Sequence, residues 1–278
     1  HAHNCPSRQS SAHKMLKPIA VLAAFLAVAN GRNLQPALRL RGGVDAGQVA
    51  NGALALQGIN AGMLALSPSK AGEVYEVEMS EVDNLIVKYI GGMMVSLVIS
   101  QYSAIQGKDA TTALGYGLIY PLIQLVQGAL NDDSAKFGQE GPIKYLNLLI
   151  TSVVTYTLLQ GGPLDQALTC KVYAGWCALN GLFAYFAPDK MLEAWGADSK
   201  SVNPVFLKFM GLSIAAIGAT FWLLTTGESA IKTLGMTTAL YLAAMIDGNF
   251  ITKDAPGSKN AQYFWMVINA AVCYFTLS

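Results

Sequence analysis

Long apolar runs separated by short polar gaps fill the chain from residue 47 to its last residues. Reading these runs with Gly, Pro and charged residues as breakers predicts eight helices. Their ranges are 47–66, 84–106, 110–130, 142–160, 167–187, 204–226, 230–248 and 261–277. At about 1.5 Å per residue, each can cross ~30 Å of hydrocarbon with modest tilt. We therefore expect an all-α integral membrane protein with eight transmembrane helices.

Composition strengthens this expectation and excludes one class of function. Of the 278 residues, 53% are apolar and 13% are charged, whereas ordinary globular chains carry about 25% charged residues. Eighteen basic residues against seventeen acidic ones leave a net charge of +1, so the chain has no electrostatic footprint for nucleic acid. A membrane β-barrel is not expected, because its strands would show alternating apolar and polar residues over segments of about ten residues instead of continuous apolar runs.

The two halves of the chain are similar when one is shifted by 120 residues. Of the 109 positions that pair 50–158 with 170–278, 14 are identical. Most of the identities are Gly, Pro, Lys or Asn, including Asn60/Asn180, Pro68/Pro188, Lys88/Lys208, Gly91/Gly211 and Gly115/Gly235. This pattern predicts two four-helix repeats, 47–160 and 161–278; the alternative is eight unrelated spans with a fortuitous offset. An even number of crossings per repeat gives the halves parallel topology about a pseudo-twofold axis along the membrane normal.

The first 46 residues have the pattern of a targeting region. Residues 1–14 precede the first methionine and are expected to be an upstream or disordered segment. Residues 15–29 resemble a signal peptide, with Lys17, a short apolar core and Ala27-Val28-Ala29 as the cleavage site. Residues 30–46 contain Arg32, Arg39 and Arg41 and no acid until Asp45.

A signal followed by an arginine-bearing, acid-free stretch with a Leu-Arg-Gly-Gly run resembles the bipartite presequences of algae with secondary plastids. The resemblance implies a plastid membrane of an alga with a complex plastid. Because Asn30 stands where such signals often carry Phe, an endoplasmic reticulum or other endomembrane location stays open.

The gaps between helices predict which side of the membrane each loop faces. We call side A the side of the amino terminus and of the gaps after the second, fourth and sixth helices, and side B the opposite side. Side B carries nine basic residues, Lys70, Lys88, Lys136, Lys144, Lys190, Lys200, Lys208, Lys253 and Lys259, against six on side A after residue 29. The positive-inside rule makes side B cytosolic or stromal. Its loops 67–83 and 188–203 are the expected docking surface for a membrane-protein partner.

Histidine is confined to the first 14 residues, which restricts the chemistry of the rest. Without it there are no Ser/His or Cys/His nucleophilic pairs and no His-ligated zinc, iron or haem. Cys170, Cys177 and Cys273 have no C-x-x-C spacing and are expected to be small buried thiols rather than a redox pair. We therefore predict a non-enzymatic protein without a cofactor or metal site.

Polar residues inside the predicted spans are the candidates for binding. Asn60 and Asn180 lie in the first helix of each half, where they can pair with each other near the pseudo-axis or line a small polar cavity. Lys88 and Lys208 lie about one turn inside the second helix, where a buried lysine would be functional and a snorkelling lysine would not.

Four glycines, Gly91, Gly211, Gly115 and Gly235, are the predicted helix-packing positions, because small residues allow helices in lipid to approach closely.

Two family resemblances can be stated. Asn131-Asp132-Asp133 resembles the first aspartate-rich motif of UbiA-type membrane prenyltransferases, but Ser134, Ala135 and Lys136 follow it, and the acids near the matching place in the second half are Asp247 and Asp254. Each half is also similar to DoxX-like four-helix membrane units, through a helix ending at Pro, a loop with Trp195-Gly196 in the second copy, and a helix opening on Lys with Gly soon after. That resemblance implies a fold unit without a defined activity.

Three functions follow from these observations. The first is an accessory, assembly or scaffold component of a plastid or endomembrane. The alternative is a carrier or channel for a small neutral or lipophilic solute at the interface between the repeats. The third, a UbiA-like prenyltransferase, requires Asp132 and Asp133 to bind diphosphate through magnesium.

Overall fold

The computed structural model describes residues 45–137, 145–162, 164–194 and 202–278, and every regular element in these ranges is a helix. The elements are α2 (Ala46–Leu66), α3 (Pro68–Tyr75), α4 (Glu81–Ile105), α5 (Ala110–Leu130), η1 (Asp133–Phe137), α6 (Leu146–Gln160), α7 (Gln166–Phe186), α8 (Pro188–Ala194), α9 (Pro204–Thr225), α10 (Ala230–Ile246), η4 (Asp247–Ile251) and α11 (Lys259–Leu277). The predicted all-helical class is confirmed, and a long helix occupies each of the eight expected places. Of the predicted upstream (1–14), signal (15–29) and arginine-containing (30–46) segments, residues 1–44 lie outside the described residues, and Asp45 and Ala46 are the cap and the first residue of α2.

Five helices are long and apolar enough to cross a membrane: α2, α4, α5, α9, and α10 continued through η4 to Ile251. Helix α6 is apolar but has only 15 residues. Helices α7 and α11 have 21 and 19 residues and a lower hydropathy. The chain therefore has the helices of a multi-pass membrane protein.

Side-chain caps explain where several helices begin. Asp45, Asp109, Asp165 and Ser229 each precede a helix and accept a hydrogen bond from a backbone N–H of its first turn. Such caps satisfy N–H groups that have no partner within the helix. The turns that precede Asp109 and Ser229 contain Gly107 and Gly227, whose φ angles of +83° and +89° favour glycine.

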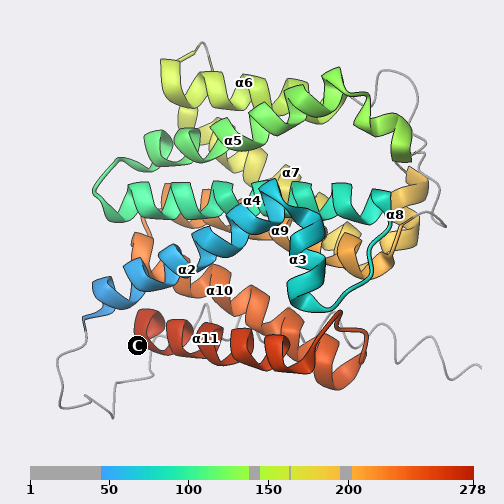
Figure 1. The fold of residues 1–278 in the computed structure, drawn as a ribbon. Helices are drawn as coiled ribbons and strands as arrows, with labels where there is room; N and C mark the ends of the chain where they lie inside the picture. The colour runs from blue at the N-terminus through green and yellow to red at the C-terminus, as the bar shows by residue number, and fades with distance from the viewer. Residues whose placement is uncertain (1–44, 138–144, 163, 195–201) are drawn as a thin grey trace, which may run out of the picture. The chain divides into compact units, whose positions relative to one another are not determined.

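Helix boundaries in the second half match those in the first half after the 120-residue shift. Helix α2 maps onto α7 at both ends, and α4 and α9 end at Ile105 and Thr225. Proline opens both short helices, α3 and α8, which lie toward the same end of the bundle (Figure 1). The expected loops 67–83 and 188–203 therefore contain a helix each, and residues 195–201 of the second lie outside the described ranges.

Helices α4 and α9 pack against each other in the middle of the bundle. Helix α2 packs on α4, and α7 packs on α9; α5 and α6 extend the bundle on one side, and α10 and α11 extend it on the other (Figure 1). Contacts between the halves also occur in matched pairs. Helix α2 contacts α11, and the equivalent helices α7 and α6 contact each other. Helix α4 contacts α10, and the equivalent helices α9 and α5 contact each other.

Polar groups join α4 to the second half near both of its ends. On side B, the buried Asp83 carboxylate accepts a hydrogen bond from the Asn203 N–H at 3.0 Å. Near side A, the Gln101 side chain is 1% exposed and donates to the Thr237 hydroxyl at 2.8 Å. Because an unpaired amide is costly away from water, the Gln101 bond fixes α4 against α10.

The four predicted packing glycines all lie against a neighbouring helix. A Cβ on Gly91 would overlap the backbone of α2 at Ala65, and one on Gly211 would lie 2.6 Å from the Gly181 carbonyl oxygen of α7. The corresponding neighbours are Leu159 of α6 for Gly115 and Thr276 of α11 for Gly235. Each half thus repeats the same two close approaches, of its first helix to its second and of its third helix to its fourth.

Replacing Gly91 or Gly211 with alanine is expected to destabilise the protein, because a backbone neighbour cannot move aside as a side chain can. The expected loss in the free energy of unfolding is about 1–3 kcal/mol, measured by thermal unfolding in detergent. Gly62→Ala in α2 and Gly175→Ala in α7 are matched controls, since a Cβ at either position meets no atom within 4 Å. Equal losses in the two sets of variants would contradict the packing role.

Candidate binding cavities

A cavity of about 180 Å³ lies between the halves, and we call it cavity 1. It is lined by α2, α3 and α4 from the first half and by α9, α10 and α11 from the second. Its walls are mostly apolar, with Val87, Ile90, Leu97, Phe206 and Phe209 among them. The polar groups on its wall are the side chains of Gln57, Asn60, Tyr75, Tyr241, Gln262, Trp265 and Asn269.

A second cavity, cavity 2, has a volume of about 350 Å³. It is lined by α7, α8 and α9 from the second half and by α4, α5 and α6 from the first. Asn180, Gln124 and Asn147 lie on its wall. Neither cavity has an Asp, Glu, Lys or Arg among its described lining residues.

The two cavities use equivalent residues of the two halves. Positions that differ by 120 line one cavity each: 57/177, 60/180, 72/192, 87/207, 90/210, 94/214, 97/217, 206/86, 209/89, 241/121, 245/125 and 265/145. Each half therefore lines one cavity with its first and second long helices and the short helix between them, and lines the other cavity with its second, third and fourth long helices. The central pair α4 and α9 contributes to both cavities.

Asn60 and Asn180 lie on these two different walls, and they form no hydrogen bond with each other. The Asn60 amide oxygen accepts a hydrogen bond of 2.6 Å from the Tyr75 hydroxyl. The Asn180 amide donates to the Trp176 carbonyl one turn back, at 2.8 Å. Of the two interpretations of this pair, the geometry therefore agrees with residues that line cavities rather than with a direct pair at the axis.

Tyr75, at the end of α3, connects the wall of cavity 1 to both halves. Its hydroxyl donates to Asn60 and accepts from the Trp265 indole N–H at 3.1 Å. Its backbone carbonyl accepts from the Ser258 N–H at 2.9 Å. Burial raises the pKa of the Tyr75 hydroxyl above its ordinary value, so the group stays neutral and keeps its donor. Helix α3 is thereby held over the side B end of cavity 1.

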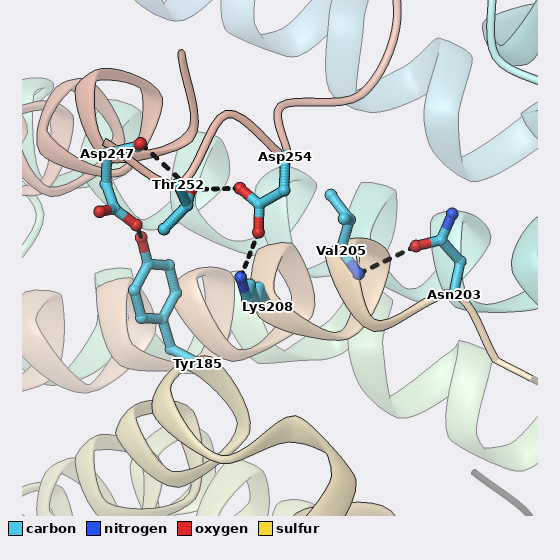
Figure 2. A network of polar contacts seen from close by, with 7 residues as sticks. All are labelled: Tyr185, Asn203, Val205, Lys208, Asp247, Thr252 and Asp254. Carbon is cyan, nitrogen blue, oxygen red and sulfur yellow. Dashed lines mark hydrogen bonds and ion pairs between the residues drawn. The ribbon is translucent and has the colours of Figure 1, made fainter. Parts of the chain in front are cut away.

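Lys88 and Lys208 occupy equivalent turns but have different surroundings. Lys208 forms an ion pair with Asp254, whose other carboxylate oxygen accepts from the Thr252 hydroxyl (Figure 2). The backbone N–H of Thr252 donates to the Asp247 backbone carbonyl at 2.8 Å. Lys88 is half-buried, and its backbone carbonyl accepts from the Gln124 amide at 3.0 Å. Neither lysine lines cavity 1 or cavity 2.

The Lys208 network continues to α7 and lies beside the start of α9. Asp247 accepts a hydrogen bond from the Tyr185 hydroxyl at 3.2 Å, and Asn203 caps α9 by accepting from the Val205 N–H at 3.0 Å (Figure 2). The hydrogen bond from Tyr185 joins the acid at the end of α10 to α7.

Sequence reasoning did not single out Tyr75, Gln262, Trp265 or Asn269. Spacing contained a usable signal, because Gln262, Trp265 and Asn269 follow one another at three and four residues and so share one face of α11. A polar stripe on an otherwise apolar helix is a reason to expect a cavity or a partner.

Among the described residues, no three His, Cys, Asp or Glu side chains come close enough together to hold a metal ion. Asp133 is buried at the start of η1, with the Tyr89 hydroxyl 3.4 Å from its carboxylate. The three cysteines in the described ranges are free thiols, and Cys170 and Cys177 are buried.

Comparison of the chain with protein-family models, curated proteins and solved structures gave no match in any of the three.

The Lys208–Asp254 pair is expected to make stability depend on pH. Burial raises the pKa of Asp254, but the Lys208 ammonium and Thr252 hydroxyl outweigh it and hold the pKa below its ordinary value. Stabilisation by a carboxylate with a lowered pKa is present above its unfolded pKa and is lost as pH falls through the folded value. Because the pair is partly exposed, Asp254→Asn should cost only about 1 kcal/mol at neutral pH.

The difference in thermal midpoint between the native protein and Asp254→Asn should shrink as pH falls from about 5 to about 3. Thermal unfolding in detergent at a series of pH values measures it. Glu73→Gln is the control, because it removes an exposed carboxylate of α3. A difference that does not change with pH would show that the ion pair does not stabilise the fold.

Proposed function

We propose that this protein is a multi-pass membrane protein of two four-helix repeats, which binds and carries a small, neutral, largely apolar solute in two equivalent cavities between the repeats. The residue-by-residue correspondence of cavities 1 and 2 carries the proposal. Two unrelated packing voids have no reason to be lined by the same positions of two halves. A duplicated binding site at a repeat interface has that property.

The exposed faces of the helices support crossing by all eight long helices. On α7, Leu168, Val172 and Leu179 are 60%, 64% and 72% exposed. Leu149 and Val153 of α6 and Phe264 and Val267 of α11 are also exposed. Exposing such apolar faces to water would be unfavourable, whereas lipid tails would cover them. The lower hydropathy of α7 and α11 reflects polar residues on their inward faces, such as Asn180 and Asn269.

Equivalent exposure in the two halves supports the repeat. Ile59 and Leu179 are 74% and 72% exposed, and Tyr102 and Trp222 are 50% and 51% exposed. At the other extreme, Leu114 and Leu234 are both fully buried. With four crossings in each repeat, the halves have the same orientation in the membrane, as the sequence analysis expects.

The residues that line the cavities support a neutral, largely apolar solute. The described walls carry no charged side chain, so an ion would lose its hydration without gaining a partner. Most of each wall is apolar, and a few amides and hydroxyls can orient a neutral molecule. An accessory or scaffold role, the plastid or endomembrane location, and the partner at loops 67–83 and 188–203 stay predictions from the sequence.

Blocking each cavity in turn tests the proposal. Met94 and Ile214 are equivalent residues, one on each wall. The native protein in lipid nanodiscs should bind 4-fluorotoluene at two saturable sites above partition into empty nanodiscs, as measured by fluorine NMR. Met94→Trp and Ile214→Trp should each leave one site, because the larger ring fills one cavity, and the double variant should leave none.

Ile59→Trp and Leu179→Trp are the matched controls, because these side chains lie on the outer surface away from the cavities. Both should keep two sites. Binding that is absent from the native protein, or unchanged in the double variant, would refute the proposal.

A further inference from the structure

Cavity 1 contains a buried hydrogen-bond acceptor without a partner. Gln262 is 8% exposed and lies on the wall of this cavity. Its amide nitrogen donates to the Pro256 carbonyl at 2.6 Å, while its amide oxygen has no hydrogen-bond partner. A buried polar atom without a partner costs free energy, so such atoms are uncommon in folded proteins unless a ligand or water completes them.

The surroundings fix which end of the Gln262 amide is free. Rotating the amide by half a turn would place its oxygen against the Pro256 carbonyl, bringing two acceptors together. The loop that contains Pro256 is held in place, because the N–H of Ser258, two residues further on, donates to the Tyr75 carbonyl at 2.9 Å. Between them, Gly257 has a φ angle of +79° and packs against the Tyr75 carbonyl where a Cβ would overlap it. The loop therefore presents Gln262 with its oxygen as the free group.

Neighbouring polar groups of cavity 1 do not supply the missing donor. The Tyr75 hydroxyl hydrogen is directed to Asn60, and the Trp265 N–H is directed to Tyr75. The Tyr241 hydroxyl donates to Ser213 at 3.1 Å. The Asn269 amide lies two turns from Gln262 and contacts the Met245 sulfur, a weak acceptor, at 3.4 Å. None of these groups is bonded to the Gln262 oxygen, which leaves that oxygen able to accept a hydrogen bond from a molecule inside the cavity.

Size limits that molecule to about one ring. An apolar cavity of about 150 Å³ accommodates benzene, and cavity 1 measures about 180 Å³. Phe206, Phe209 and Trp265 provide aromatic wall surface, against which another ring packs favourably. The volume leaves room for a ring with one or two small substituents.

We propose that cavity 1 binds a neutral single-ring molecule with a hydroxyl group, of the phenol class, whose hydroxyl donates to the Gln262 amide oxygen. This inference rests on the proposed binding function and names the ligand of one of its two cavities. The sequence places Pro142 at the position equivalent to Gln262, so the same amide is not available to cavity 2. The two cavities thus share a shape and differ in the group that selects the ligand.

A pair of probes that differ by one hydroxyl tests the inference. In the Ile214→Trp background, in which cavity 2 is filled, 4-fluorophenol should bind about tenfold more tightly than 4-fluorotoluene after correction for partition into empty nanodiscs. Gln262→Leu in that background should bring the phenol down to the affinity of the toluene and leave the toluene unchanged. Gln127→Leu removes an exposed amide outside both cavities and should keep the tenfold preference.

The outcomes separate this inference from the proposed function. Equal affinity for the two probes would overturn the hydroxyl assignment while leaving the binding function intact, and a preference that survives Gln262→Leu would do the same. Saturable binding of neither probe would overturn the binding function itself.

If Gln262→Leu does not fold, photo-crosslinking of the protein with native Gln262 decides the matter. A phenol carrying a diazirine should label the α10–α11 segment that contains Met245 and Trp265. Labelling confined to other segments would overturn the assignment.

Discussion

The contact between α4 and α9 is the interaction on which the rest of the arrangement depends. These helices are the second elements of the two halves, and they pack along each other in the middle of the bundle. Val87, Ile90 and Leu97 of α4 line cavity 1, while Ile86 and Tyr89, on another face of the same helix, line cavity 2. Helix α9 likewise lines cavity 2 with one face and cavity 1 with another. The pair is therefore the wall that separates the two cavities.

Few polar groups hold this wall in register, and their positions follow from the cost of burying them. Asp83 and Asn203 are equivalent positions that bond to each other on side B, and Gln101 joins α4 to α10 near side A. In lipid, where apolar side chains gain little by meeting one another, close packing and such hydrogen bonds carry much of the association. The glycines at 91 and 211 add the close packing by admitting α2 and α7 to the backbone of the central pair.

The two halves carry different polar groups at several equivalent positions. Gln101 is buried in the first half, and the equivalent position in the second is the buried Phe221. Lys208 has Asp254 as a partner, whereas the position equivalent to Asp254 is Ser134. Gln262 has Pro142 as its equivalent. Of these three differences, Gln262 is the one that lies on the wall of a cavity, so the proposed difference in selectivity rests on it.

Much of the helical framework could be predicted from the sequence. Apolar runs and breakers predict the long helices, since hydropathy reports a property of each segment alone. The cavities could not be predicted in the same way, because they depend on which helix faces meet across the halves. Gln262 shows the limit clearly: its free oxygen results from a loop conformation set by Gly257 and Tyr75, which are 182 residues apart in sequence.

The most direct test of the account is the orientation of equivalent positions across the membrane. In a cysteine-free background, Lys70→Cys and Lys190→Cys mark the exposed short helices of side B, and Gln106→Cys and Thr226→Cys mark the exposed turns of side A. Labelling of sealed vesicles with a membrane-impermeant maleimide should modify both members of one pair and neither member of the other. Labelling of Lys70→Cys without Lys190→Cys, or of Gln106→Cys without Thr226→Cys, would show that the halves are inverted and would contradict the account.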